Sequence, residues 1–403
     1  MLLIGIFTLL GFIIVLGFLS NFFFKTTGIP DIILLLFLGL LLGPILNFVD
    51  PFIFEDFSQA FSALALMILL FESGLNLKLY KVFKESPRAI LLAVLGIILT
   101  MTITFLFARF LLGWDLLPGL LLGAIVGGSS SSIVAPLMRK VNASNNIATL
   151  LTLESTFTDA LTVIIAIGVI QLLMQPAMNT FYSISHVIAS AFSIGSMSGL
   201  LIGIVWLKIL KALEGESYKS ILTLAIVLLL YSFTESLGGN GAISSLMFGL
   251  VIGNAKTISH ILRSKEEMKT EKEMKEFHSE ISFLVRTFFF VYLGVIVAFN
   301  SLYIVLMGVL LSVLILIGRI FAVCLSSIND NEIIKNRSLM IIMLPRGLAA
   351  AVLSQLPLYN GLSNANIYLD IVLTVIVATV IMCTIGVFIF SRSKAKNEKR
   401  GKS

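Results

Sequence analysis

The sequence predicts an all-α protein that crosses a lipid bilayer about thirteen times. Of its 403 residues, 58% are hydrophobic and only 12% are charged, which leaves too little polar surface to cover a water-soluble globule. The apolar residues fall into stretches of about 20, the length that a helix needs to span the hydrocarbon core. Most lysines gather between these stretches or in the C-terminal tail. The bilayer is therefore the expected solvent of the fold.

Thirteen stretches have the length and composition of membrane spans. They lie at residues 2–24, 29–47, 57–76, 89–112, 116–138, 147–173, 183–210, 219–237, 241–256, 278–298, 301–326, 337–357 and 366–390. The first stretch has no basic residues before it and no small-residue cleavage motif directly after it, so we expect a retained span. The basic residues 391–403 then form a cytoplasmic tail.

The loops between these stretches alternate in positive charge. One set carries lysine or arginine at positions 25, 78, 81, 84, 88, 139, 140, 208, 211, 219, 256–275, 335 and 337, and the other set carries none. Cytoplasmic loops are the ones enriched in lysine and arginine. We therefore expect the N-terminus outside and the C-terminus in the cytoplasm. The net charge of +6 is explained by this topology, and no nucleic-acid partner is expected.

Two pairs of spans share their glycine spacing. The sequence FLGLLLG at residues 37–43 matches MFGLVIG at residues 247–253, and Gly74 of span 3 corresponds to Gly294 of span 10. Six spans, a linker span at about 183–210 and six further spans place the second repeat upside down relative to the first. The repeats are expected at about 1–175 and 219–390. Chance similarity of apolar helices is the alternative.

Span 6 places two acids in otherwise apolar sequence. At about 100° per residue, Asp159 shares a helix face with Ser155, and the Glu154 side chain points about 140° away from Asp159. Asp159 with Ser155 and Thr158 offers the oxygen ligands that a hard monovalent cation prefers. The alternative is that both acids only pair with basic residues.

Two arginines in apolar sequence supply possible partners for acids. Arg319 of span 11 is predicted to neutralise Glu154, because an unpaired guanidinium is too costly at this depth. Arg346 of span 12 is predicted to pair with Glu72 of span 3. Asp159 then remains as the carboxylate that can titrate.

Spans 5 and 12 are predicted to be interrupted at corresponding positions of the two repeats. Span 5 contains Gly127-Gly128 followed by four serines, and span 12 contains Pro345-Arg346-Gly347. Paired interruptions point to an ion site near the middle of the membrane, where unwound carbonyls and half-helix ends are available. We include Ser129 and Ser130 in this site. A simple kink in each span is the alternative.

With these features the chain resembles the monovalent cation/proton antiporter superfamily, and within it the sodium/proton exchangers of archaea and bacteria. The resemblance covers almost the whole chain. It implies a core bundle and a dimerisation bundle, and a homodimer. It also implies that Asp159 exchanges the ion and the proton, with a Na⁺ site at Asp159, Ser155, Glu154 and Ser129, where the family often has threonine in the place of Ser129.

Two departures from the family pattern concern the ion. Where the family often has Thr-Asp-Pro, this chain has Ser129-Ser130-Ser131, and Thr158 takes the place of asparagine. The serine run is also similar to that of potassium/proton antiporters.

The expected function is therefore exchange of a monovalent cation, Na⁺ first and Li⁺ or K⁺ as alternatives, for H⁺ in the cell membrane. One ion for one proton is expected, by alternating access. A K⁺/H⁺ efflux antiporter and a cation channel are the competing interpretations. The sequence contains no His-Glu-x-x-His motif, and we expect neither an enzyme nor a cofactor.

Overall fold

All regular elements that the computed structural model describes are helices. The described residues are 2–49, 55–77, 87–174, 181–213, 215–261, 272–297, 301–328 and 330–400. Parts of two predicted basic loops, residues 78–86 and 262–271, lie outside them. The helices of the first half are α1 Leu2–Thr27, α2 Asp31–Leu40, η1 Leu41–Ile45, α3 Glu55–Asn76, α5 Pro87–Phe107, η3 Ala108–Leu112, α6 Leu116–Ile125, α7 Ser131–Lys140, α8 Asn145–Met174 and α9 Phe181–Ala212.

The helices of the second half follow the same pattern of long and short segments. They are α10 Lys219–Ser236, α11 Gly241–Gly253, α12 Ala255–Ile261, α13 Lys272–Ile296, α14 Leu302–Ser326, α15 Asn331–Lys335, α16 Arg337–Ile342, α17 Leu348–Leu353, α18 Leu356–Tyr359 and α19 Ala365–Arg400. Helices dominate because a chain in hydrocarbon must satisfy its backbone hydrogen bonds within each segment.

The described helices agree with the predicted spans. Nine of them are long and apolar enough to cross a membrane, and each falls on a predicted span. Four shorter apolar helices, at 31–45, 116–125, 241–253 and 348–359, fall on the remaining predictions. The all-α membrane fold is confirmed, while the number of crossings stays a prediction. Helix α19 continues to Arg400, so the segment after residue 390 begins as an extension of this helix.

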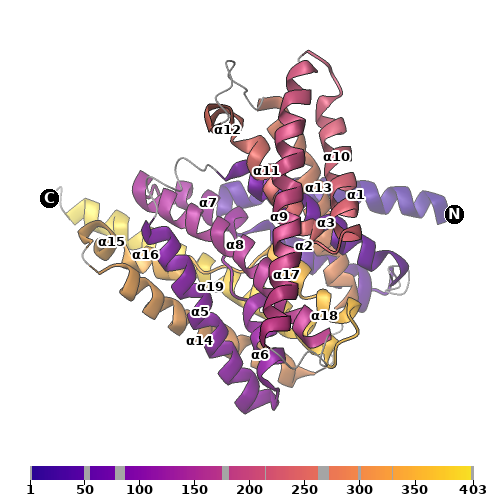
Figure 1. Ribbon diagram of the computed structural model, residues 1–403. Coiled ribbons are helices and arrows are strands. Elements are labelled where there is room, and N and C mark those ends of the chain that lie inside the picture. The colour runs from indigo at the N-terminus through magenta and orange to yellow at the C-terminus, as the bar shows by residue number, and fades with distance from the viewer. Residues whose placement is uncertain are drawn as a thin grey trace. The chain divides into compact units, whose positions relative to one another are not determined.

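The chain forms two compact units. The first contains residues 1–55, 86–170 and 290–403, and the second contains residues 56–85 and 171–289. In the first unit, α14 packs against α5 and α19, and α6 packs against α5; α5 and α14 run side by side in Figure 1. In the second unit, α11 packs against α9 and α10. Each unit draws on segments of both predicted repeats.

The matched glycines make equivalent helix crossings in the two halves. In the first unit, Gly39 of α2 lies against Gly294 of α13. A Cβ atom added to Gly39 would lie 2.7 Å from the Gly294 Cα. In the second unit, Gly249 of α11 lies against the backbone of Phe71. A Cβ atom added to Gly74 of α3 would lie 2.8 Å from the Leu250 nitrogen. Small residues permit such close backbone approach between membrane helices. The equivalence supports the predicted inverted repeat, whose boundaries stay a prediction.

The start of α8 is tied to the short helix α15. The Glu332 carboxylate accepts hydrogen bonds from the Ser144 hydroxyl at 2.8 Å and from the Asn146 amide at 2.9 Å. These two donors hold the pKa of Glu332 below its usual value. Helix α8, which carries both acids of span 6, thus has an anchor at its N-terminal end.

We expect Gly249→Ala to lower the stability of the folded protein by about 1 to 3 kcal/mol, because the added methyl group meets the Phe71 carbonyl and backbone atoms cannot rotate away. The matched control is Gly96→Ala in α5, where an added Cβ meets nothing within 4 Å. The control should melt at or slightly above the wild-type temperature, since alanine favours helix. Thermal unfolding in detergent measures both; a Gly249→Ala protein as stable as the control would contradict the crossing.

Candidate functional site

Spans 5 and 12 are both interrupted, as predicted, and their unwound segments cross in the first unit. Helix α6 ends at Ile125 and α7 begins at Ser131; α16 ends at Ile342 and α17 begins at Leu348. The Ser130 amide donates a hydrogen bond to the Pro345 carbonyl at 2.8 Å. The Arg346 guanidinium donates to the Gly128 carbonyl at 2.7 Å. Each unwound segment therefore satisfies backbone groups of the other.

The crossing brings together four half-helix ends. The last carbonyls of α6 and α16 and the first amides of α7 and α17 lack partners within their own helices, and they carry partial negative and positive charge. Arg346 is 5% exposed and places its positive charge on a carbonyl that follows α6. Such ends inside a membrane are suited to bind ions.

Asp159 lies beside the first residue of α7. Its Oδ2 accepts a hydrogen bond from the Ser131 hydroxyl at 2.9 Å, and the Ser131 amide also donates to this carboxylate. Asp159 is only partly buried. Arg346 and Glu154 are close enough to act on it electrostatically. The carboxylate is thus held at a helix N-terminus and keeps access to its surroundings.

Ser131 is a residue that the sequence analysis did not include in the site. Of the serine run, only Ser129 and Ser130 were placed in the site, whereas the Ser130 hydroxyl is hydrogen-bonded to Ser132 at 3.0 Å and its amide donates to the Pro345 carbonyl. The signal that could have identified Ser131 is its position after the interruption. As the first residue of the second half-helix, Ser131 has an amide without a partner in α7, and both this amide and its hydroxyl donate to the Asp159 carboxylate.

Of three further predicted residues, Ser129 belongs to the interruption and contacts α8, and Ser155 and Thr158 belong to α8. The Ser129 amide donates to the Thr158 Oγ1 at 3.1 Å, and the Ser129 hydroxyl donates to Glu154 Oε1 at 3.2 Å. The hydroxyls of Ser155 and Thr158 donate to the backbone carbonyls of Thr152 and Ser155, each at 3.0 Å. Because the hydroxyl protons of Ser155 and Thr158 point to carbonyls of α8, the oxygen lone pairs of these two hydroxyls point away from those carbonyls. These three residues are buried.

Glu154 and Arg319 form a buried, two-point ion pair. Arg319 Nη1 donates to Oε1 at 2.9 Å and Nη2 donates to Oε2 at 3.2 Å, while its Nε donates to the Met340 carbonyl at 3.2 Å. Arg319 is 7% exposed and Glu154 is 1% exposed. The two side chains that the sequence analysis expected to neutralise each other are in contact. With Ser129 as a further donor, both oxygens of Glu154 have strong partners.

The other expected pair, Arg346 with Glu72, is replaced by contacts within each unit. Glu72 lies in the second unit, where its charge partner is Arg286 and where Ser279 and Ser282 of α13 lie against its carboxylate. Arg346 lies in the first unit and bonds Gly128. The sequence analysis gave Arg286 no role, because span periodicity alone does not say which helices are neighbours.

A family model described as sodium/hydrogen exchanger, transmembrane, matches residues 10–392 of the chain. The chain is 27% identical over 364 residues to the K(+)/H(+) antiporter NhaP2 of Shewanella sp. strain ANA-3, covering 88% of this chain and 61% of that protein. It is 28% identical over 281 residues to the probable Na(+)/H(+) antiporter 2 of Methanocaldococcus jannaschii, covering 67% and 64% of the two. The chain thus spans about three-fifths of the length of these curated relatives.

Among solved structures, the chain is similar to the sodium proton antiporter MjNhaP1 of Methanocaldococcus jannaschii at pH 8. The TM-score is 0.79 at 22% identity, and the match covers 95% of this chain and 99% of that one. This likeness concerns the fold. Because the family model matches residues 10–392, nearly the whole chain, the chain belongs to the transmembrane sodium/hydrogen exchanger family.

Proposed function

We propose that the protein exchanges a monovalent cation for H⁺ across the cell membrane, with both competing for the carboxylate of Asp159. The observation that carries this proposal is the contrast between the two acids of α8. Glu154 is closed off by Arg319 and Ser129, whereas Asp159 is partly exposed and is held by Ser131 alone among the hydrogen bonds described for it. A carboxylate of this kind can release a proton, accept a cation and return to the protonated form.

The cation would use the oxygens that lie around the interruption of span 5. Asp159 supplies the charge, and the hydroxyls of Ser155, Thr158 and Ser129 are the neutral oxygen donors proposed to complete its surroundings. Hard cations prefer such oxygen sets. Glu154 and Ser130 were also expected among the ligands; their contacts favour supporting roles, Glu154 in the ion pair and Ser130 at the crossing.

Na⁺ is the first candidate ion, because the family description names sodium. K⁺ is a second candidate, favoured by the serine run at residues 129–132 and by the curated relative named as a K(+)/H(+) antiporter. The proposal extends to a homodimer with each N-terminus outside and each C-terminus in the cytoplasm, as the charge of the loops and the family favour. An enzymatic role and a cofactor form no part of it.

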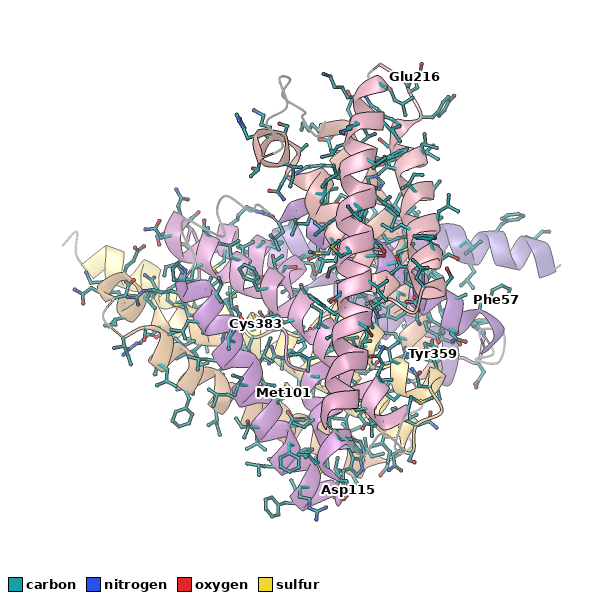
Figure 2. The ribbon with its side chains drawn as sticks, viewed as in Figure 1. Phe57, Met101, Asp115, Glu216, Tyr359 and Cys383 are labelled. Atoms are coloured by element: carbon teal, nitrogen blue, oxygen red, sulfur yellow. The ribbon has the colours of Figure 1, made fainter. Side chains whose placement is uncertain are left out.

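Replacing Asp159 by asparagine should abolish exchange, because asparagine can neither bind a proton at physiological pH nor neutralise a cation. Cation-driven proton flux into proteoliposomes, with Na⁺, K⁺ and Li⁺ tested across pH, measures the effect. Asp115→Asn is the matched control: Asp115 pairs with Arg109 at 3.1 Å, its side chain is 89% exposed, and Figure 2 labels it at the end of α6 away from the interruption. Normal exchange by the Asp159→Asn variant would exclude Asp159 as the exchange site.

The exchange should move no net charge. Asp159 is the one titrating group in the proposed cycle, because arginine stays protonated in proteins and Glu154 remains bonded to Arg319. One cation then replaces one proton. A voltage-sensitive dye in the same vesicles should show no potential generated by transport, and addition of a proton-independent K⁺ ionophore should leave the rate unchanged. A steady potential would contradict the one-to-one ratio, and an ohmic conductance would favour the channel.

Breaking the Glu154–Arg319 pair on one side should cost about 3 to 5 kcal/mol of stability, since an unpaired charge is left buried. Arg319→Gln and Glu154→Gln should each melt far below the wild type. The double variant, which buries no charge, should recover most of the loss and, because Glu154 is not the exchanging group, should still transport. Melting and flux measured on the same preparations test both parts. A stable double variant without exchange would assign Glu154 to the cation site.

A further inference from the structure

Helix α19 lies along the end of α16 and the unwound segment of span 12 that follows it, residues 343–347, and contacts this stretch at three points. Gly386 packs against the side chain of Ile342, and Cys383 Sγ lies 4.0 Å from Met343 Sδ and touches the backbone of Leu344. Thr379 Oγ1 accepts a hydrogen bond from the Arg346 amide at 3.1 Å. Thr379, Cys383 and Gly386 follow one another at spacings of four and three positions, so they share one face of α19. Figure 2 labels Cys383, the middle contact.

The bond to Thr379 completes the hydrogen bonding of a deeply buried hydroxyl. Thr379 has no exposed surface, and its Oγ1 donates to the carbonyl of Val375 at 2.7 Å, one turn back in its own helix. The same oxygen is then free to accept from Arg346. A residue of the same shape without the hydroxyl would leave the Arg346 amide without this acceptor.

The side chain of Arg346 depends on this backbone anchor. Its guanidinium reaches the Gly128 carbonyl through Nη1, while its buried Nε makes no hydrogen bond with the described residues. A guanidinium held at a single carbonyl is positioned mainly by the backbone that carries it. Thr379 therefore fixes one end of the contact that joins the two interruptions.

We propose that Thr379 is a positioning residue for the cation site: by binding the Arg346 amide, it holds the guanidinium on the Gly128 carbonyl and so sets the geometry of the crossing beside Asp159. This inference rests on the proposed cation/proton exchange. Thr379 itself touches neither ion.

The test compares Thr379→Val with Thr384→Val in proteoliposomes. Both threonines donate to a carbonyl one turn back in α19, Thr384 to Val380 at 2.8 Å, but among the described contacts only Thr379 accepts from span 12. Thr379→Val should raise the apparent KM for the cation about tenfold, the scale of one lost buried hydrogen bond. Thr384→Val and Thr379→Ser should stay within about twofold of wild type. A purely structural role would lower the amount of active protein and the maximal rate, and would leave KM unchanged.

Hydrogen exchange of the peptide that contains Arg346 provides a readout independent of transport. The Arg346 amide should exchange faster in Thr379→Val than in Thr384→Val. A KM for Thr379→Val equal to that of Thr384→Val overturns the inference. If Thr379→Val does not accumulate, Thr379→Cys replaces it, since sulfur is a weaker acceptor; a cysteine variant with the KM of Thr379→Ser then overturns the inference. If the wild-type protein transports no cation, the proposed function is refuted. The hydrogen-exchange rate of the Arg346 amide still decides whether Thr379 positions Arg346.

Discussion

The site depends on two stretches of unwound backbone that satisfy each other inside a hydrophobic bundle. A broken helix in a membrane exposes amides and carbonyls that lipid cannot bond, so it persists only where protein groups take them up. Here Ser130 and Pro345 pair through their backbones, and Arg346 bonds Gly128. The glycines at 127 and 128 let α8 approach, since a side chain at 128 would crowd the Thr158 carbonyl. The other contacts of the site are arranged around these hydrogen bonds between the two unwound segments.

The two acids of α8 illustrate how neighbouring carboxylates acquire different roles. They are five positions apart and point to different sides of one helix, and each side offers a different partner. Towards α14, Glu154 finds the forked guanidinium of Arg319, whose geometry matches both carboxylate oxygens. Towards α7, Asp159 finds the hydroxyl and amide of Ser131, which are neutral. The nearby Arg346 acts on Asp159 electrostatically, but no ion pair of Asp159 is described, so its oxygens are left for the proposed cation.

Features that arise from one segment were predictable from the sequence. The interruptions were visible in Gly127-Gly128 and Pro345-Arg346-Gly347, and the need of Arg319 for a carboxylate followed from the cost of an isolated buried charge. The features that escaped prediction depend on neighbours in space. The partner of Glu72 is Arg286, and the role of Ser131 depends on where α7 begins relative to α8. Hydrophobic length locates the helices to within a few residues at each end, and it does not say which helices are neighbours.

The glycine crossings limit how the helices can move. Where Gly39 meets Gly294, and where Gly249 meets the backbone beside Phe71, main chain touches main chain with no side chain between. The close approach recurs one turn further along each pair, where Gly43 lies against Val295 and Gly253 lies against the backbone of Leu75. Two such contacts a turn apart oppose both axial sliding and a change of crossing angle, because either would press atoms into a space already filled by main chain. Each of these helix pairs is therefore expected to move as one rigid piece.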